Sequence, residues 1–296
     1  MSATIVLTQN NVVKDGQNNS LVYTFPNSVS FPHHQIAVQA VSMFYCWNNI
    51  SSALGNNTFT FTWTVGSTPS NVVITLPDGM YNISDIQAYI ENYCISQANY
   101  YITNTTTGRN IFYLQLLINP TAYAVQLNTF PVPTSLPVNC VLPTNWSGYP
   151  TISACPQVTF PSNFCNIVGF TANYQSPSSL TQFSINSNNG APQVQPNPSL
   201  FLAMSNIDNK YAIPSSIIYS ITPTNVEFGG QIIDRPPQFA WNRLLPGTYN
   251  SLRLSILGTN LSSLPLLDPN MTILLTIRDT KDLGIADLVN VISGGK

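Results

Sequence analysis

The side chains that could carry out chemistry are few in this sequence, and they are not spaced for it. His33 and His34 are the two histidines of the chain, and neighbours in an extended segment point to opposite faces, so they do not both ligate one metal. A serine or cysteine nucleophile needs a histidine base held by a third group, and both histidines lie next to Pro32 in an N-terminal leader. The His-x-His and carboxylate set of a cupin-type metal site is missing. We therefore expect no metal site and no nucleophilic triad.

Carboxylate pairs for sugar hydrolysis would have to come from acids spread along the chain. Two of these acids, Asp78 and Asp268, lie in turn sequences, where a carboxylate ordinarily bonds to its own backbone. The paired glycines 229–230 and 294–295 lack the spacing and the lysine of a phosphate-binding loop. We expect no enzyme activity and no cofactor. The candidate acids are Asp78, Asp85, Glu91, Asp208, Glu227, Asp234 and Asp268.

The five cysteines are odd in number and are never spaced Cys-x-x-Cys. Free, buried thiols in a reducing compartment are the preferred interpretation, and a bridge from Cys155 to Cys140 or to Cys165 stays open. The first residues lack the basic and long apolar regions of a signal peptide, and no apolar run reaches the roughly 20 residues of a membrane-spanning helix.

Charged residues make up 7% of the chain, against roughly a quarter in ordinary soluble domains. With 9 basic and 11 acidic residues the net charge is −2, so no field attracts nucleic acid or an anionic membrane surface. A surface with so few charges is a weak barrier to self-association. We interpret it as a surface that becomes buried in an assembly; an extracellular adhesin or a chain of biased composition is the alternative.

The elements begin with a predicted hairpin. Residues 36–47 are apolar on both faces, as in an inner strand that is covered on both sides. Aromatic residues and valine alternate with threonine over 59–65, which indicates a strand with one dry face. The Asn- and Gly-rich residues 48–57 predict the turn between them. Trp47 and Trp63 are expected in the core of this hairpin.

One helix and several more strands follow. Ser84 and Gln87 have the form of a capping box, and apolar residues continue at helical spacing from Ile86 to Cys94. Prolines crowd residues 128–199, which predicts a loop-rich insertion or small subdomain. The other expected strands are 72–76, 111–118, 123–127, 200–204, 216–221, 251–257 and 271–277, and a weak helical period covers 283–292.

These elements predict an all-β fold, namely a single jelly roll of two stacked antiparallel sheets with one short helix and a loop-rich insertion. The expected divisions are an N-terminal arm at 1–35, a first jelly-roll part at 36–127, the insertion at 128–199, and a second jelly-roll part with the C-terminal segment at 200–296.

A proline-led loop carries the candidate subunit-interface residues Phe239, Trp241 and Arg243. Aromatic and arginine side chains on loops are favoured anchors of protein interfaces. Trp241 fits a second interpretation equally well, in which it closes the end of its own sandwich.

Several of these segments resemble the penton family, the minor capsid proteins of virophages, polinton-like viruses and related large DNA viruses. The likeness covers roughly the first hundred residues and the last fifty, whereas residues 128–199 depart from the pattern. The matching motifs are Phe-Tyr-Cys-Trp-Asn-Asn-Ile-Ser at 44–51, Asn-Asn-Thr-Phe at 56–59, Leu-Pro-Asp-Gly-Met-Tyr at 76–81 before the helix, and Leu-Asp-Pro-Asn-Met-Thr-Ile at 267–273 within 254–278.

The resemblance implies a structural protein of the virion, assembled in the host cytoplasm, with no catalytic residues. Its implied partners are its own copies, which form a homopentamer at each icosahedral five-fold vertex, and trimers of a double jelly-roll major capsid protein. No nucleic acid partner is expected, and contacts with an internal membrane or other minor capsid proteins stay open.

Two other classes are kept as alternatives. A carbohydrate-binding or receptor-binding jelly-roll spike or lectin would stack sugars on Trp146, Tyr149 or Trp241, and glycan-array binding would favour it. A glycan-cleaving enzyme would lose hydrolysis when one carboxylate is changed. Rings of five in electron micrographs, or this chain at particle vertices, would favour the capsid protein.

Overall fold

The computed structural model describes residues 2–15, 18–189, 192–195, 197–268 and 270–282. Its contacts divide the chain into two compact units. The jelly-roll unit consists of residues 1–47 and 197–296, and the inserted unit consists of residues 48–196. No helix among the described residues is both long and apolar enough to span a bilayer. The predicted helical period at 283–292 lies outside the described residues.

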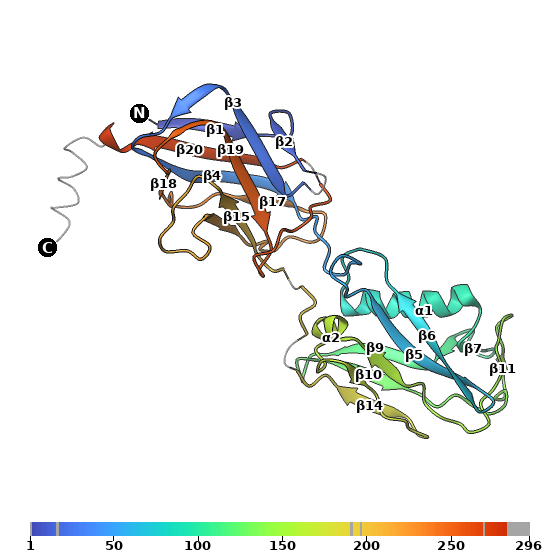
Figure 1. The fold of residues 1–296 in the computed structure, drawn as a ribbon. Coiled ribbons are helices and arrows are strands. Elements are labelled where there is room, and N and C mark those ends of the chain that lie inside the picture. Colours follow the sequence, from blue (N-terminus) through green and yellow to red (C-terminus); the bar gives the residue numbers. More distant parts are fainter. Residues whose placement is uncertain (1, 16–17, 190–191, 196, 269, 283–296) are drawn as a thin grey trace. The chain divides into compact units, whose positions relative to one another are not determined.

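The jelly-roll unit contains two antiparallel sheets (Figure 1). The first has the order β1-β20-β4-β17, and β18 also pairs with β4; the second has the order β16-β15-β19-β3-β2. The bounds in the first sheet are Ser2–Leu7 (β1), Thr272–Asp279 (β20), His34–Phe44 (β4), Gln231–Asp234 (β17) and Asn242–Arg243 (β18). Those in the second are Ile217–Ile221 (β16), Leu200–Met204 (β15), Thr248–Leu257 (β19), Ser20–Ser30 (β3) and Val12–Lys14 (β2).

The strand order is that of a jelly roll. If β17 and β18 are taken as two parts of one strand and β2 as an extra edge strand, eight strands remain. In chain order, the first strand (β1) pairs with the eighth (β20), and the second (β3) pairs with the seventh (β19). The third strand (β4) pairs with the sixth (β17), and the fourth (β15) pairs with the fifth (β16). This pairing is what results when one long hairpin is rolled into two Greek keys. The predicted all-β, jelly-roll class is thus confirmed.

Alternating side chains of both sheets form the core of this unit. On β20, the predicted apolar face from Met271 to Ile277 is buried, and on β4 the buried residues include Ile36, Val41 and Met43. A bulge between Leu274 and Leu275 shifts the register against β4. The inner faces therefore carry the branched aliphatic residues that the sequence pattern indicated.

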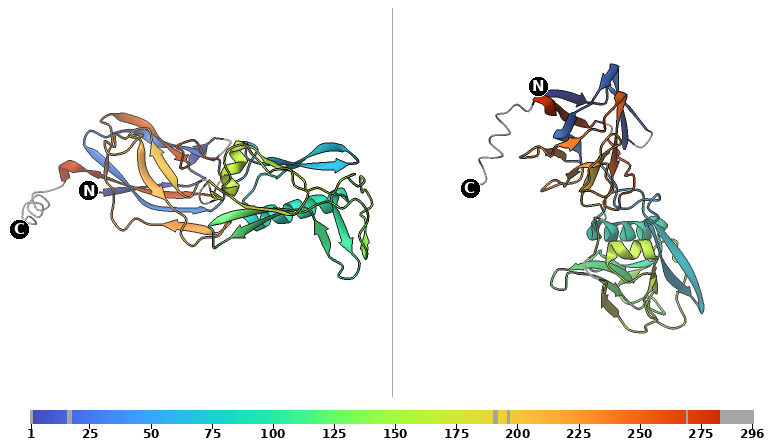
Figure 2. Two further views of the ribbon diagram at one scale, coloured as in Figure 1. Left: turned by 90° about the horizontal axis from the view of Figure 1, so that it is seen from below. Right: turned by 60° about the vertical axis from the view of Figure 1, so that its left-hand side comes forward.

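The N-terminal segment is not an arm, in contrast to the prediction for residues 1–35. β1 pairs with β20 over the full span from Ser2 to Leu7, and β3 pairs with β19. Figures 1 and 2 show these blue strands among the red and orange C-terminal ones. The short apolar run and the Asn-rich stretch after it gave no indication of partners roughly 220 to 280 residues away.

The predicted hairpin of residues 36–65 is also wrong, although both of its strands exist. β4 pairs within the first sheet of the jelly-roll unit, whereas β5 (Thr58–Val65) pairs with β6 (Thr68–Thr75) and β12 (Val158–Phe160) in the inserted unit. Trp47 and Trp63 are buried as predicted, but in different units. The chain leaves the jelly roll directly after Trp47, so the insertion begins at 48 rather than at 128.

The inserted unit has three small sheets and two helices. The helices are α1 (Ile83–Gln97) and α2 (Ser162–Val168). The sheets have the orders β13-β12-β5-β6, β14-β10-β9 and β11-β7-β8. The remaining strands are β7 (Tyr101–Asn104), β8 (Asn110–Phe112), β9 (Leu114–Asn119), β10 (Ala124–Thr129), β11 (Cys140–Val141), β13 (Tyr174–Gln175) and β14 (Phe183–Asn186).

Residues 128–196 fold together with residues 48–127 around one core. The rings of Phe59, Phe160 and Phe164 contact one another edge-on or tilted, with centroids 4.9–5.6 Å apart, and so join β5 to β12 and α2. The proline-rich stretch therefore contains short strands and α2 rather than loop alone, because its few apolar residues pack on those of β5.

Helix α1 confirms the predicted helix and corrects its cap. The side chain of Asn82 accepts from the backbone N–H of Asp85 at 3.0 Å, and the carboxylate of Asp85 accepts from the N–H of Asn82 at 2.9 Å. The capping box is thus formed by Asn82 and Asp85 rather than by Ser84 and Gln87. Ala98 ends the helix in the left-handed conformation.

Candidate functional site

The groups considered first for chemistry are dispersed in the structure. Among the described residues, no three His, Cys, Asp or Glu side chains gather where they could hold a metal ion. His33 is exposed, and the ring of His34 packs edge-on against Phe31. All five cysteines are free thiols, so neither of the two possible bridges forms. The described residues therefore offer surfaces and pockets rather than a cluster of reactive groups.

The predicted interface residues lie at one end of the first jelly-roll sheet. Trp241 is half-buried and immediately precedes β18, and the ring of Phe239 meets its ring edge-on at 5.6 Å. Phe239 is 44% exposed. Arg243 is also exposed and pairs in register with Gln35 of β4.

The sequence analysis did not identify Arg278, whose side chain contacts both Trp241 and Gln35 at this end of the sheet. Its guanidinium carbon lies 4.0 Å from the centroid of the Trp241 ring, and its Nε donates to the side-chain oxygen of Gln35 at 2.9 Å. Ser2, Arg278, Gln35 and Arg243 face one another across four strands. No local signal in the sequence links Arg278 to Trp241, because they come together only through the pairing of β20 and β18 with β4.

The same face of the sheet continues into an apolar surface. We call it the outer-face patch and define it as Val6, Ala40, Phe44, Ile233 and Leu274. Val6, Phe44 and Ile233 are 44%, 39% and 61% exposed, while Ala40 and Leu274 are half-buried. Their neighbours along each strand, such as Leu7, Met43 and Ile232, point into the core. An exposed, uncharged sheet face of this kind is typical of an interaction surface.

The residues proposed for sugar stacking are already engaged within their own units. Trp146 packs between Trp63 and Tyr149, with ring centroids 5.5 Å and 5.4 Å away, and is partly buried against the core of the inserted unit. Trp241 packs against Arg278. All three residues are half-buried, and each ring contacts another side chain of its own unit.

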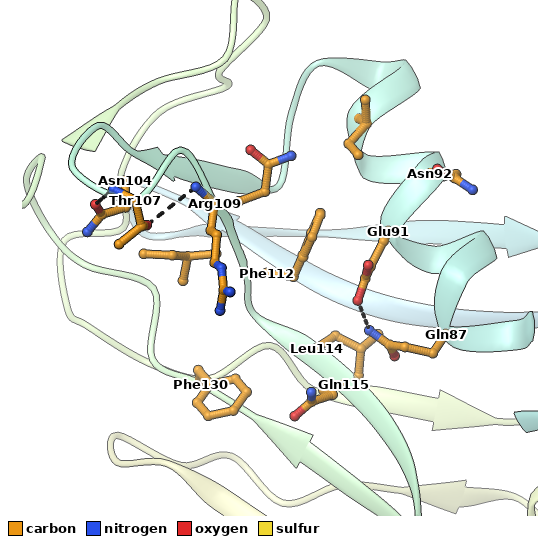
Figure 3. Close-up of a pocket in the computed structure, with 13 residues that line it drawn as sticks. Gln87, Glu91, Asn92, Asn104, Thr107, Arg109, Phe112, Leu114, Gln115 and Phe130 are labelled. Carbon is orange, nitrogen blue, oxygen red and sulfur yellow. Dashed lines mark hydrogen bonds between the residues drawn. The ribbon is translucent and has the colours of Figure 1, made fainter. Parts of the chain in front are cut away.

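A pocket of about 680 Å³ opens on the inserted unit (Figure 3). One wall is formed by Gln87 and Glu91 of α1, and the others come from the β7–β8 hairpin, β9 and Phe130. Figure 3 shows the Arg109 side chain and Glu91 on either side of the Phe112 ring. Sequence reasoning named Glu91 only as one of several acids and did not identify this pocket.

Comparison with known proteins gives likenesses among solved structures. No family model matches the chain, and no curated protein matches it. Among solved structures, the chain is similar to a crystal structure of selenomethionine-labelled mavirus penton protein, with 13% identity and a TM-score of 0.43 over 94% of this chain and 98% of that one. With so low a score, the jelly-roll assignment rests on the strand order of this chain.

Proposed function

We propose that this chain is a capsid building block whose copies form rings of five at icosahedral vertices. The observation that carries the proposal is the outer-face patch, a group of exposed and half-buried apolar residues that lie with the uncharged Ser42, Thr272 and Gln231 on one face of a jelly-roll sheet. Jelly rolls are common in viral capsid proteins. A chain with 7% charged residues has little like-charge repulsion to overcome when its copies meet.

In this proposal a second copy covers the patch, and Phe239, Trp241 and Arg243 lie at the rim of the contact. Closure at five would leave no open heterologous surface, as symmetry requires of a finite ring. Major capsid protein trimers around the ring and a place in the virion follow from the motif resemblance of residues 44–59, 76–81 and 254–278. The role is mechanical, with binding energy coming from the burial of apolar surface.

The test is the mass of the purified protein in solution, together with images of negatively stained particles. We expect a five-fold species that dissociates on dilution. Ile233→Glu places a charge in the patch and should shift the equilibrium to monomer by tenfold or more, since burying an unpaired charge costs at least ~1.4 kcal/mol. Val138→Glu is the matched control, because Val138 is 87% exposed on the inserted unit.

A wild-type protein that is monomeric at every concentration, and that is absent from the vertices of purified particles, would overturn the proposal. Equal loss of rings in both variants would show that the patch is not the contact.

A further inference from the structure

The inserted unit is nearly free of charge, which makes its few charged residues informative. Residues 48–196 contain four charged side chains, namely Asp78, Asp85, Glu91 and Arg109, and no histidine or lysine. Asp78 accepts from the backbone N–H of Ser52 at 2.7 Å, and Asp85 caps α1. Those two have local structural roles. The other two, of opposite sign, line the same pocket.

The carboxylate of Glu91 is held in place by a chain of hydrogen bonds. The side-chain amide of Gln87 donates to Oε1 of Glu91 at 2.7 Å, and the side-chain oxygen of Gln87 accepts from the backbone N–H of Leu116 at 2.8 Å. Gln87 is only 9% exposed, so β9 fixes it and it in turn fixes Glu91 (Figure 3). The second oxygen of Glu91 has no partner among the described residues. Glu91 is thus oriented as an acceptor on the pocket wall.

The guanidinium of Arg109 is available for a ligand. Arg109 follows the turn of the β7–β8 hairpin and is exposed, and its side chain makes no hydrogen bond or ion pair with the described residues. A guanidinium matches a carboxylate through two parallel hydrogen bonds. The rest of the lining combines amide and hydroxyl groups with the rings of Phe112 and Phe130 and the aliphatic side chains of Ile95, Ile111 and Leu114.

We propose that this pocket binds an acidic sugar, either a sialic or a uronic acid at the end of a glycan. Arg109 would bind the carboxylate, Glu91 and the neighbouring amides would bind hydroxyl groups, and Phe112 would contact the apolar face of the ring. A bare anion such as phosphate is disfavoured by Glu91, and a simple cation by Arg109. The volume of about 680 Å³ lies within the range of small-ligand sites.

The test is a titration of the full chain that is monitored by nuclear magnetic resonance. N-acetylneuraminic acid, glucuronic acid, glucose and lysine are the separate probes. We expect saturable binding of one or both acids with a dissociation constant on the order of 1 mM, and binding of glucose at least tenfold weaker. The acid that binds more tightly shows whether the ligand is a sialic or a uronic acid. No saturable binding of either acid, equal binding of glucose, or a preference for lysine would overturn the proposal.

Variants separate the two charged groups. Arg109→Gln should weaken acid binding about tenfold or more, and Arg109→Lys should also weaken it, because the charge stays while the paired bonds are lost. Glu91→Gln should reduce affinity several-fold while keeping the preference for acids. Lys210→Gln, which removes an exposed cationic side chain of the other unit outside the proposed subunit contact, is the matched control and should bind as wild type. Unchanged binding in both Arg109 variants would overturn the proposal, whereas ring formation by these proteins reports on the proposed assembly separately.

Discussion

Arg278 shows how a single side chain gains its role from its position in the sheet. It lies over the ring of Trp241 and donates to Gln35, so it connects the loop before β18 with β4 and β20. Of the two interpretations of Trp241 from sequence, the contact with Arg278 accounts for its half-buried state within its own unit. Phe239 beside it is exposed, and the proposed subunit contact would cover it.

We predict that Trp241→Ala destabilises the jelly-roll unit. The change removes a cation–π contact of about 0.5–1 kcal/mol and the packing of a large ring, for a total loss of about 1–2 kcal/mol. Urea denaturation at a concentration where the protein is monomeric measures the free energy of unfolding. Phe239→Ala is the control and should cost less, because Phe239 is 44% exposed. Equal losses in the two variants would contradict the assigned packing of Trp241.

The buried thiols give a second prediction at this scale. Burial raises the pKa of Cys94 to about 12, above the ordinary value of 9.0, because the thiolate would lose its hydration. In the unfolded chain the thiol ionises near 9.0, so the unfolded state binds fewer protons between pH 9 and 12. The stabilising effect of the neutral thiol is complete below pH 9 and is lost as the pH rises toward 12.

We therefore expect wild type to lose stability between pH 9 and 10.5 more steeply than Cys94→Val, with a difference in slope of up to about 1.4 kcal/mol per pH unit. Chemical denaturation at several pH values measures this slope. Parallel curves for the two proteins would show that Cys94 is not a buried neutral thiol.

At the scale of elements, local patterns identified strands and helices but not their partners. Alternation marked β5, and an apolar run marked β4, yet the turn assumed between them is the point where the chain passes from one unit to the other. The pairing of β4 with β20 joins residues about 240 apart. The pairing register of these strands depends on the whole jelly roll, so it cannot be predicted from a short stretch of sequence.

The N-cap of α1 is a further feature that the local sequence did not determine, although its candidate residues are close together in the chain. Asn82, Ser84 and Asp85 are all suitable cap residues, and the backbone of Asn82 is the one in extended conformation. The pocket residues Glu91 and Arg109 could not be paired from sequence either, because α1 and the β7–β8 hairpin meet only in the folded unit. What the sequence did offer was the scarcity of charge around them.

We predict that Asn82→Ala destabilises the inserted unit by about 1 kcal/mol, the usual effect of removing an N-cap side chain. Ser84→Ala should change the free energy of unfolding by less than about 0.5 kcal/mol, because this exposed side chain does not cap the helix. Thermal or urea denaturation compares the two. A larger loss of unfolding free energy for Ser84→Ala than for Asn82→Ala would show that Ser84, the cap residue predicted from the sequence, caps the helix.

At the scale of the whole molecule, the chain is a jelly roll with a second unit inserted between its third and fourth strands. Within the jelly-roll unit, Nε1 of the buried Trp47 donates to the carbonyl of Asn197 at 3.2 Å, so the points where the chain leaves and returns are hydrogen-bonded together. Within the inserted unit, the amide of the buried Asn49 donates to the carbonyl of Val194. Each unit therefore closes its own ends and has its own core.

We predict that the two units fold independently. Residues 48–196 expressed alone should give one cooperative thermal transition and a dispersed amide spectrum, because their core draws only on residues of that segment. A second protein joins residue 47 to residue 197 through a short Gly-Ser linker, which the Trp47–Asn197 bond makes geometrically possible. It should fold and should form the same rings as the full chain, since the outer-face patch lies entirely within the jelly-roll unit. Fragments that fail to fold would contradict the division, whereas a folded jelly roll without rings would place the assembly contact on the inserted unit.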